Sequence, residues 1–200
     1  MHDWHVKNKA KFENVGQWKR AWYYPKNNES MHDAVQRESK AARDSAGILD
    51  ASTLGKIDIQ GTDASEFLNR VYTNAWSKLD IGKCRYGLML NEDGMVYDDG
   101  VTTRLNENHY IMTTTTGGAA TVLGKLEDYL QTEWPELDVY LTSVTDHYAT
   151  ISVCGPKSKK IISQVIPNLD LSDDNFPHMS FKNTKINEIK CRVMRISFTG

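Results

Sequence analysis

Hydrophobic positions recur along the chain with two different periods, and the switch between them predicts where helices and strands lie. Apolar residues three and four positions apart mark an amphipathic helix, whereas alternation of apolar and polar residues marks a half-buried strand. In chain order, the pattern predicts a helix over 31–45, a strand over 53–60, a helix from 62 or 63, strands over 83–90, 95–105 and 109–114, a helix from 119 that ends at 134–135, strands over 139–144 and 148–154, a helix after 155–156 and a last strand over 190–198.

Capping residues support the first two helices. Ser30 is placed to cap the helix over 31–45, with Asp33 at its third position and Gly47 as its stop. In the next helix, Glu66 occupies the capping-box position. The apolar residues that this second helix is expected to bury are Phe67, Leu68 and Val71.

The clearest part of the pattern is a meander of three strands over 83–114. The turn at 91–94 ends in Gly94, which can adopt a positive φ, and a second turn at 106–108 leads to the third strand. Such a meander among helices predicts an α+β fold with mainly antiparallel sheets and flanking helices. Because the pattern restarts near residue 136, we expect a first subdomain over 31–136 and a second α+β subdomain over 137–200.

Residues 1–30 are rich in aromatic side chains and show little periodicity. They include Trp4, Trp18 and Trp22, and aromatic surface of this kind is costly to expose. We therefore predict an irregular N-terminal arm that packs on a larger body.

Composition narrows the class of protein. Hydrophobic residues make up 40% of the chain and charged residues 25%, as in a globular protein, and the formal net charge is −2. This charge, with no Lys/Arg block, argues against nucleic-acid binding, and no apolar run is long enough to cross a membrane. The three cysteines lie outside any CxxC spacing, which indicates free thiols in a reducing compartment. We expect the cysteines to be small core residues and the protein to be cytoplasmic.

An acidic pair in the meander is the main candidate for chemistry. Asp98 and Asp99 are adjacent on a strand, so they face opposite ways, and Asp99 shares the more apolar face with Tyr97 and Val101. We therefore predict that Asp99 is the inward carboxylate, suited to accepting a proton from a nitrogen centre or to steadying its positive charge. The structural alternative for Asp99 is that it only bonds backbone amides of the neighbouring turn. We expect Asp98 to be a solvated strand residue.

Two neighbouring features allow both a structural and a functional interpretation. The threonines at 113–116, with the glycines at 117–118, either extend a strand into a tight helix entry or offer hydroxyls and amides to a ligand. Arg85 and Tyr86 either clamp a flat ring or belong to the core. The six histidines have no metal-ligand spacing, and we predict no structural metal.

Several sequence blocks together resemble a known family. They are GILDASTLGKIDIQG, EFLNRVYTNAWSKL, CRYGLMLNEDGMVYDDGVTTRL, YIMTTTTGGAA, LQTEWPELDVYLTSVT and RVMRISFTG. In this order they resemble the folate-binding part of heterotetrameric sarcosine oxidase alpha subunits, and more broadly the aminomethyltransferase family of the glycine cleavage T-protein. The likeness extends over essentially the whole chain, including the N-terminal arm.

The resemblance implies the aminomethyltransferase folate-binding fold with a tetrahydrofolate site. It implies transfer of the one-carbon unit of an oxidised amine to tetrahydrofolate, giving 5,10-methylenetetrahydrofolate. Asp99 matches the family's essential aspartate, which orients and activates N10 and stabilises a cationic iminium. The positions that match the border of the folate pocket are Tyr86, Met89, Asp98, Thr113, Thr114 and Thr115.

The resemblance also implies partners. Flavin and NAD are expected only elsewhere in the parent complex, whose flavoprotein beta subunit would oxidise the amine. The family continues after the matching Thr-Gly with a pterin-anchoring glutamate, so we expect this chain to be a fragment truncated after the start of its second subdomain. Two rival interpretations are a non-catalytic folate-binding module and a scaffold whose aromatic arm holds other subunits.

Overall fold

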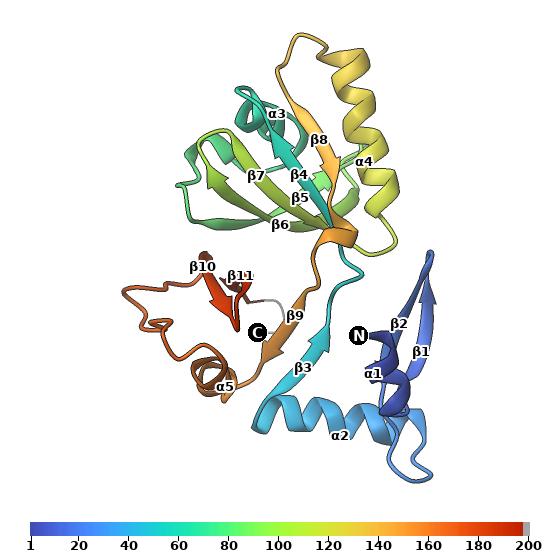
Figure 1. The fold of residues 1–200 in the computed structure, drawn as a ribbon. Helices are drawn as coiled ribbons and strands as arrows, with labels where there is room; N and C mark the ends of the chain where they lie inside the picture. Colours follow the sequence, from blue (N-terminus) through green and yellow to red (C-terminus); the bar gives the residue numbers. More distant parts are fainter. Residues whose placement is uncertain (198–200) are drawn as a thin grey trace. The chain divides into compact units, whose positions relative to one another are not determined.

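The computed structural model describes residues 1–197 of the 200-residue chain (Figure 1). The chain forms two compact units, and each is described by itself. The N-terminal unit comprises residues 1–53 and 149–169, and the sheet unit comprises residues 54–148 together with the chain from 170 onward.

Over residues 1–53 and 149–169, the N-terminal unit consists of three helices and two two-stranded ribbons. Its elements are α1 (His2–Lys7), β1 (Lys11–Val15), β2 (Trp18–Tyr23), α2 (Met31–Asp44), β3 (Gly47–Asp50), β9 (Ile151–Cys154) and α5 (Ser158–Val165). β1 pairs antiparallel with β2, and β3 pairs antiparallel with β9. Ser30 and Asp33 form a capping box at the start of α2, as the sequence predicts.

The sheet unit is built on five antiparallel strands in the order β5-β6-β7-β4-β8. Its elements are β4 (Gly55–Gln60), α3 (Ala64–Val71), η1 (Trp76–Lys78), β5 (Cys84–Leu90), β6 (Val96–Asn106), β7 (His109–Thr114), α4 (Ala119–Asp128), η2 (Tyr129–Glu133), β8 (Tyr140–Ser143), η3 (Thr145–His147), β10 (Ser180–Ile186) and β11 (Ile189–Arg195).

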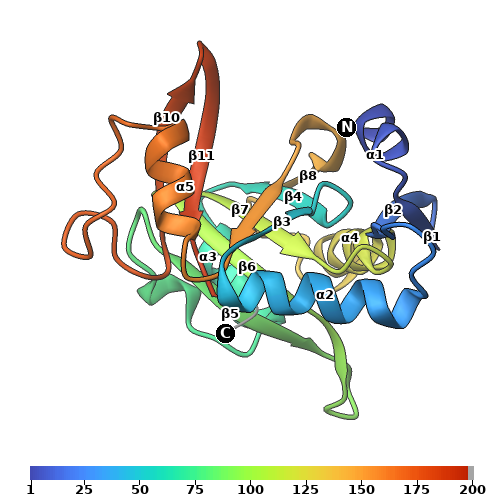
Figure 2. The same cartoon turned by 90° about the horizontal axis from the view of Figure 1, so that it is seen from below.

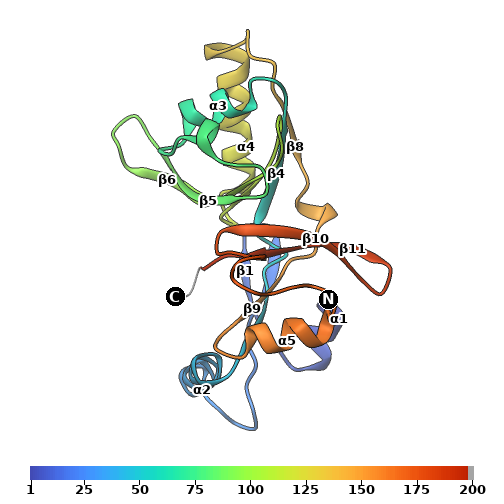
Figure 3. The same cartoon turned by 90° about the vertical axis from the view of Figure 1, so that its left-hand side faces the viewer.

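Helices α3 and α4 lie on the same face of this sheet (Figure 3). Between the helices and the strands lies the core of the unit, which is apolar. Its members are Ile57, Ile59, Ala64, Phe67, Leu68, Tyr72, Trp76, Leu79, Met89, Tyr110, Met112, Val122 and Leu126. Burial of this surface is the main force that holds the sheet against its helices.

Strands β10 and β11 form a long hairpin, seen extended in Figure 2. Its turn places Asn187 and Glu188 at φ values of 45° and 62°, as the right-handed twist of a tight hairpin requires. The start of the hairpin lies beside the start of β5, where the backbone N–H of Cys84 donates to the carbonyl of Met179 at 2.8 Å.

Much of the predicted secondary structure is confirmed. The three meander strands agree with β5, β6 and β7 to within about a residue at each end, and Gly94 in the first turn has a φ of 79°. The α+β class with mainly antiparallel pairing is confirmed as well. No helix within residues 1–197 combines the length and apolar character that crossing a bilayer requires.

The N-terminal arm differs from its prediction. Residues 1–30 contain a regular helix and hairpin, and Trp4 and Trp22 are 60% and 50% exposed. The alternation in β1 and β2 was obscured by their aromatic and charged residues, and both faces of the hairpin keep contact with solvent.

The predicted boundary near residue 136 is not where the structure divides the chain. β8 follows that boundary but pairs with β4, and β9 pairs with β3. The sequence predicts both strands but not their distant partners, because pairing is set by tertiary contacts. The short strand β3 and the strand β10 were not predicted, and the predicted end of the last strand, Phe198, lies outside the described residues.

The predicted capping box of α3 is wrong. Asp63 is the N-cap without a side-chain cap bond, and Glu66 instead accepts from the Arg70 guanidinium at 2.9 Å. The hydroxyl of Thr62 donates to Asp138 at 2.9 Å. Tertiary contact with the loop before β8 therefore replaces the local cap.

Candidate functional site

The pleat of β5 and β6 sorts their side chains onto two faces. Met89 is directly opposite Asp98, and Leu88 is directly opposite Asp99. Directly opposite residues point to the same side of an antiparallel pair. The first pair lies on the helix-covered face, beneath α3 and α4, and the second pair lies on the opposite face, which we call the open face.

Asp98 is the buried member of the acidic pair, with only 4% of its surface exposed. Its carboxylate accepts two hydrogen bonds from Thr115, one from the hydroxyl at 2.6 Å and one from the backbone N–H at 3.2 Å. Burial raises the pKa of Asp98, and the bonds from Thr115 oppose that rise. Since Thr115 also accepts from the N–H of Gly118 at 3.1 Å, Asp98 fixes the loop that enters α4.

Asp99 is half-buried on the open face. Its Oδ2 accepts a hydrogen bond of 2.7 Å from the hydroxyl of Tyr86, a side chain that is 47% exposed. That bond, together with partial desolvation and the nearby carboxylates, raises the pKa of the Tyr86 phenol, so it remains a protonated donor at neutral pH. In the part of the chain that the structure describes, no other group donates to the Asp99 side chain.

The prediction that Asp99 is the inward carboxylate is therefore wrong, because Asp99 points away from the helix-covered face. Strand parity correctly separates the two aspartates, but at this point of β6 the buried face is the one with Asp98. The prediction that Asp98 is a solvated strand residue is therefore wrong as well. The reason is that α3, α4 and Trp76 cover this face, and Thr115 supplies the hydrogen bonds that a buried carboxylate needs. The structural alternative, in which Asp99 bonds only backbone amides of the turn, is not observed either, because its hydrogen-bond donor is the Tyr86 hydroxyl.

The other predicted ligand-contacting residues are divided by the sheet. Met89 is fully buried in the core on the helix-covered face, so it does not share a surface with Tyr86. Arg85 likewise lies on the face opposite Tyr86, and its guanidinium donates to the carbonyl of Ala75. The structure does not bring Met89 or Arg85 together with Tyr86 and Asp99.

The threonine hydroxyls are largely committed to internal bonds. The Thr113 hydroxyl bonds both backbone groups of Val101, at 2.9 and 3.2 Å. Thr114 is buried and donates to the carbonyl of Thr115 at 2.9 Å, while Thr115 holds Asp98. These contacts favour the structural interpretation of the loop, although Thr113 still lies on the open face.

Sequence reasoning missed three residues of the open face. Leu88, opposite Asp99, was not considered, although the register of the hairpin points to it. Asp58 and His109 form an ion pair of 2.6 Å between β4 and β7 when the histidine is protonated. No local signal in the sequence connects two residues that lie so far apart along the chain.

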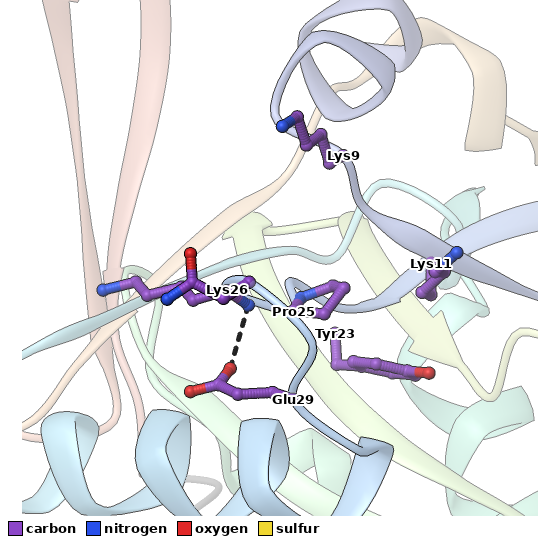
Figure 4. Close-up of a pocket in the computed structure, with 7 residues that line it drawn as sticks. Lys9, Lys11, Tyr23, Pro25, Lys26 and Glu29 are labelled. Atoms are coloured by element: carbon purple, nitrogen blue, oxygen red, sulfur yellow. Dashed lines mark hydrogen bonds between the residues drawn. The ribbon is translucent and has the colours of Figure 1, made fainter.

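A hollow of about 650 Å³ lies in the N-terminal unit and contains none of the predicted site residues (Figure 4). Its lining consists of Lys9, Lys11, Tyr23, Pro25, Lys26, Asn27 and Glu29. The labelled lysine side chains point in different directions in Figure 4. Glu29 is occupied by the Arg37 guanidinium and the backbone N–H of Lys26, which lower its pKa to about 2.

Comparison with known proteins places this chain in a family. The family model for the GCVT N-terminal domain matches residues 1–200, and the chain belongs to this family. The crystal structure of the glycine cleavage system aminomethyltransferase T from Bartonella henselae superposes with a TM-score of 0.75 at 24% identity, covering 90% of this chain and 45% of that one. The predicted aminomethyltransferase fold is confirmed.

Among curated proteins, the chain is similar to sarcosine oxidase alpha subunits. It is 58% identical over 201 residues to "Sarcosine oxidase subunit alpha" of Corynebacterium sp. (strain U-96), and 46% identical over 203 residues to that of Rhizobium meliloti (strain 1021). It is 29% identical over 200 residues to an aminomethyltransferase of Chlorobium phaeovibrioides. The chain spans 21% and 20% of the two sarcosine oxidase subunits, and 51% of the aminomethyltransferase.

Proposed function

We propose that this chain supplies part of a tetrahydrofolate-binding surface in an enzyme of the sarcosine oxidase type. The reaction would transfer the one-carbon unit of an oxidised amine to tetrahydrofolate, giving 5,10-methylenetetrahydrofolate. The observation that carries this proposal is the division of the acidic pair, which leaves the Asp99 carboxylate on the open face with Tyr86 as its donor. The identity to sarcosine oxidase alpha subunits supports the choice of reaction.

The chemistry of Asp99 suits an amine ligand. Tyr86 occupies Oδ2 and fixes the orientation of the carboxylate, while no bond within the described residues occupies Oδ1. An ionised carboxylate with a free oxygen accepts a hydrogen bond from an N–H group and stabilises positive charge that develops on that nitrogen. Asp98 is not available for this role, because Thr115 holds it on the other face.

The residues around Asp99 fit a reduced pterin or its aminobenzoyl group. Tyr86 offers an exposed aromatic ring, and Leu88 and Val101 offer apolar contact on the same face. Tetrahydrofolate, when bound, supplies the amine nitrogens that accept the one-carbon unit. Tyr86, Leu88 and Val101 would hold the flat ligand with one nitrogen toward Asp99, and Thr113 lies at the margin of the same face.

The test uses the whole protein that carries this chain and compares Asp99→Asn with Glu92→Gln. Glu92 is an exposed carboxylate in the turn of the same hairpin, so its variant removes the same charge from a neighbouring position. We expect Asp99→Asn to lower the yield of methylenetetrahydrofolate by about 10²-fold or more while the amine is oxidised at an unchanged rate. We expect Glu92→Gln to behave as wild type.

Two measurements separate binding from chemistry. Isothermal titration with tetrahydrofolate reports the affinity, and the ratio of methylenetetrahydrofolate to free formaldehyde reports the transfer. Equal affinity and an unchanged product ratio in Asp99→Asn would contradict the proposed role of Asp99. Loss of tetrahydrofolate binding in Glu92→Gln would instead assign the effect to net charge.

A second function, holding other subunits, is favoured by the N-terminal unit. The exposed side chains of Trp4 and Trp22 present aromatic surface, and exposed aromatic residues are enriched at protein interfaces. We propose that this aromatic surface contacts another subunit, with the flavoprotein beta subunit as the expected partner. This role is compatible with the first.

Co-purification of the partner subunits with a Trp4→Ala/Trp22→Ala variant tests the scaffold role. We expect the double variant to lose the partner, whereas Tyr140→Ala, which removes an aromatic side chain that is 68% exposed in the sheet unit, keeps it. Retention of the partner by the double variant would exclude this surface as the contact.

A further inference from the structure

The guanidinium of Arg192, in β11, lies over two aromatic rings. Its guanidinium carbon lies 5.5 Å from the ring centroid of Phe181 and 5.9 Å from that of Tyr148. These distances are within the range of cation–π attraction. The rings restrict the rotation of the guanidinium and therefore hold its planar set of donors in one orientation.

The guanidinium of Arg192 has no anionic partner in the described part of the chain. Its Nε is buried and makes no hydrogen bond, and no ion pair among residues 1–197 involves this residue. Arg195, three residues along the same strand, shows the usual arrangement, because it pairs with Asp173 at 2.8 Å and donates to the carbonyl of Phe176. A buried donor without a partner is costly, and such a group in a folded protein requires an explanation.

The surroundings of Arg192 add positive charge. The buried thiol of Cys84 lies nearby and accepts a hydrogen bond from Thr103 at 3.3 Å. Burial raises the pKa of this thiol, and the bond from Thr103 and the charges of Arg192 and Lys83 oppose the rise. Lys83 therefore adds a second positive charge near this thiol, beside that of Arg192, and positive charge attracts anions.

We propose that Arg192, which lies over the rings of Tyr148 and Phe181, binds the carboxylate group of a small molecule. A guanidinium matches a carboxylate with two parallel N–H···O bonds in one plane. The faces of the two rings offer apolar contact to a flat skeleton attached to the carboxylate. A phosphate dianion also offers two oxygens to such a fork, but its remaining charged oxygens would face the apolar rings instead of water.

This site is independent of the proposed function, because none of its residues belongs to the Asp99–Tyr86 pair. The test is NMR on the full chain, in which the ¹⁵Nε–¹Hε signal that disappears in Arg192→Lys is assigned to Arg192. Benzoate is the probe, acetate and inorganic phosphate are comparators, and sodium chloride at equal ionic strength is the control for charge screening. We expect a saturable shift with benzoate, a weaker one with acetate, and with phosphate a shift no larger than that caused by sodium chloride.

Variants decide whether the guanidinium fork causes the binding. Arg192→Lys keeps the charge but not the fork, and should weaken benzoate binding, followed on the backbone amide of Phe181, by about tenfold or more. Lys182→Gln removes an exposed positive charge from the same hairpin and should leave the affinity unchanged. Both variants must keep the dispersed backbone spectrum of the folded chain. A Tyr148→Leu variant, with one ring removed, provides an independent check and should also bind benzoate more weakly.

Three results would overturn the proposal. A benzoate shift no larger than the chloride shift would show that Arg192 is not an anion site. Unchanged benzoate affinity in Arg192→Lys would assign binding to other groups. Tighter saturation with phosphate than with benzoate would exclude the carboxylate assignment.

Discussion

The helix-covered face and the open face of one sheet give two adjacent aspartates, Asp98 and Asp99, opposite environments. On the covered face, Asp98 is enclosed and its hydrogen bonds come from Thr115 of the same unit. On the open face, Asp99 is held by Tyr86 and keeps an oxygen for an outside partner. The comparison shows that a strand can place a structural carboxylate and a candidate functional carboxylate side by side, because its pleat sends them to different environments.

The largest expected effect is a difference in the free energy of unfolding between variants on the two faces. Met89→Ala should lower the free energy of unfolding by about 2–5 kcal/mol, because it leaves a cavity in the core. Leu88→Ala, the neighbouring residue on the open face, should cost only about 1 kcal/mol, because its side chain is partly in solvent. Urea unfolding of both variants measures the difference, and equal losses would mean that the open face is as enclosed as the core.

A smaller effect concerns the partner of Asp98. Thr115→Val removes the hydroxyl that donates to this carboxylate, and should lower the free energy of unfolding by about 1–3 kcal/mol. Thr121→Val is the control, because its exposed hydroxyl donates only to the carbonyl of Gly118. A loss in the control as large as that in Thr115→Val would show that the loop does not depend on Asp98.

The pH dependence of stability should also reveal which aspartate is buried. The folded protein raises the pKa of Asp98 above its ordinary value of 3.8, so the folded state binds the proton more tightly than the unfolded state. Its contribution to stability therefore falls as pH rises from about 3.8 through the raised pKa. Asp98→Asn should lose this decline in urea unfolding series across that window, and retention of the decline in this variant would assign it to other groups.

The smallest expected effect is on the open face. Tyr86→Phe removes the hydrogen bond that orients Asp99 and should lower the yield of methylenetetrahydrofolate by about tenfold, less than Asp99→Asn does. The free energy of unfolding should stay nearly unchanged, because the ring remains and the hydroxyl lies near the surface. Wild-type yield in Tyr86→Phe would show that Asp99 needs no orienting partner.

The sequence predicted local features more reliably than distant ones. The capping box at Ser30 and Asp33 and the turn with Gly94 depend on residues close together in the chain, and both are present. The predicted cap at Glu66 is absent because Asp138 forms the hydrogen bonds with Thr62 and Asp63 at the start of α3. The pairing of β8 with β4 and of β9 with β3 needed contacts across the chain that no local pattern encodes.

By itself, the sequence determined the antiparallel meander, the opposite orientation of Asp98 and Asp99, and the family to which the blocks belong. These depend on side-chain period, turn residues and order along the chain, all of which are local properties. Only the tertiary structure decided which face of the meander is buried, because burial depends on where α3, α4 and Trp76 pack. It likewise placed Arg192 over the rings of Tyr148 and Phe181, since residues from distant segments meet only when the sheet and its hairpin have assembled.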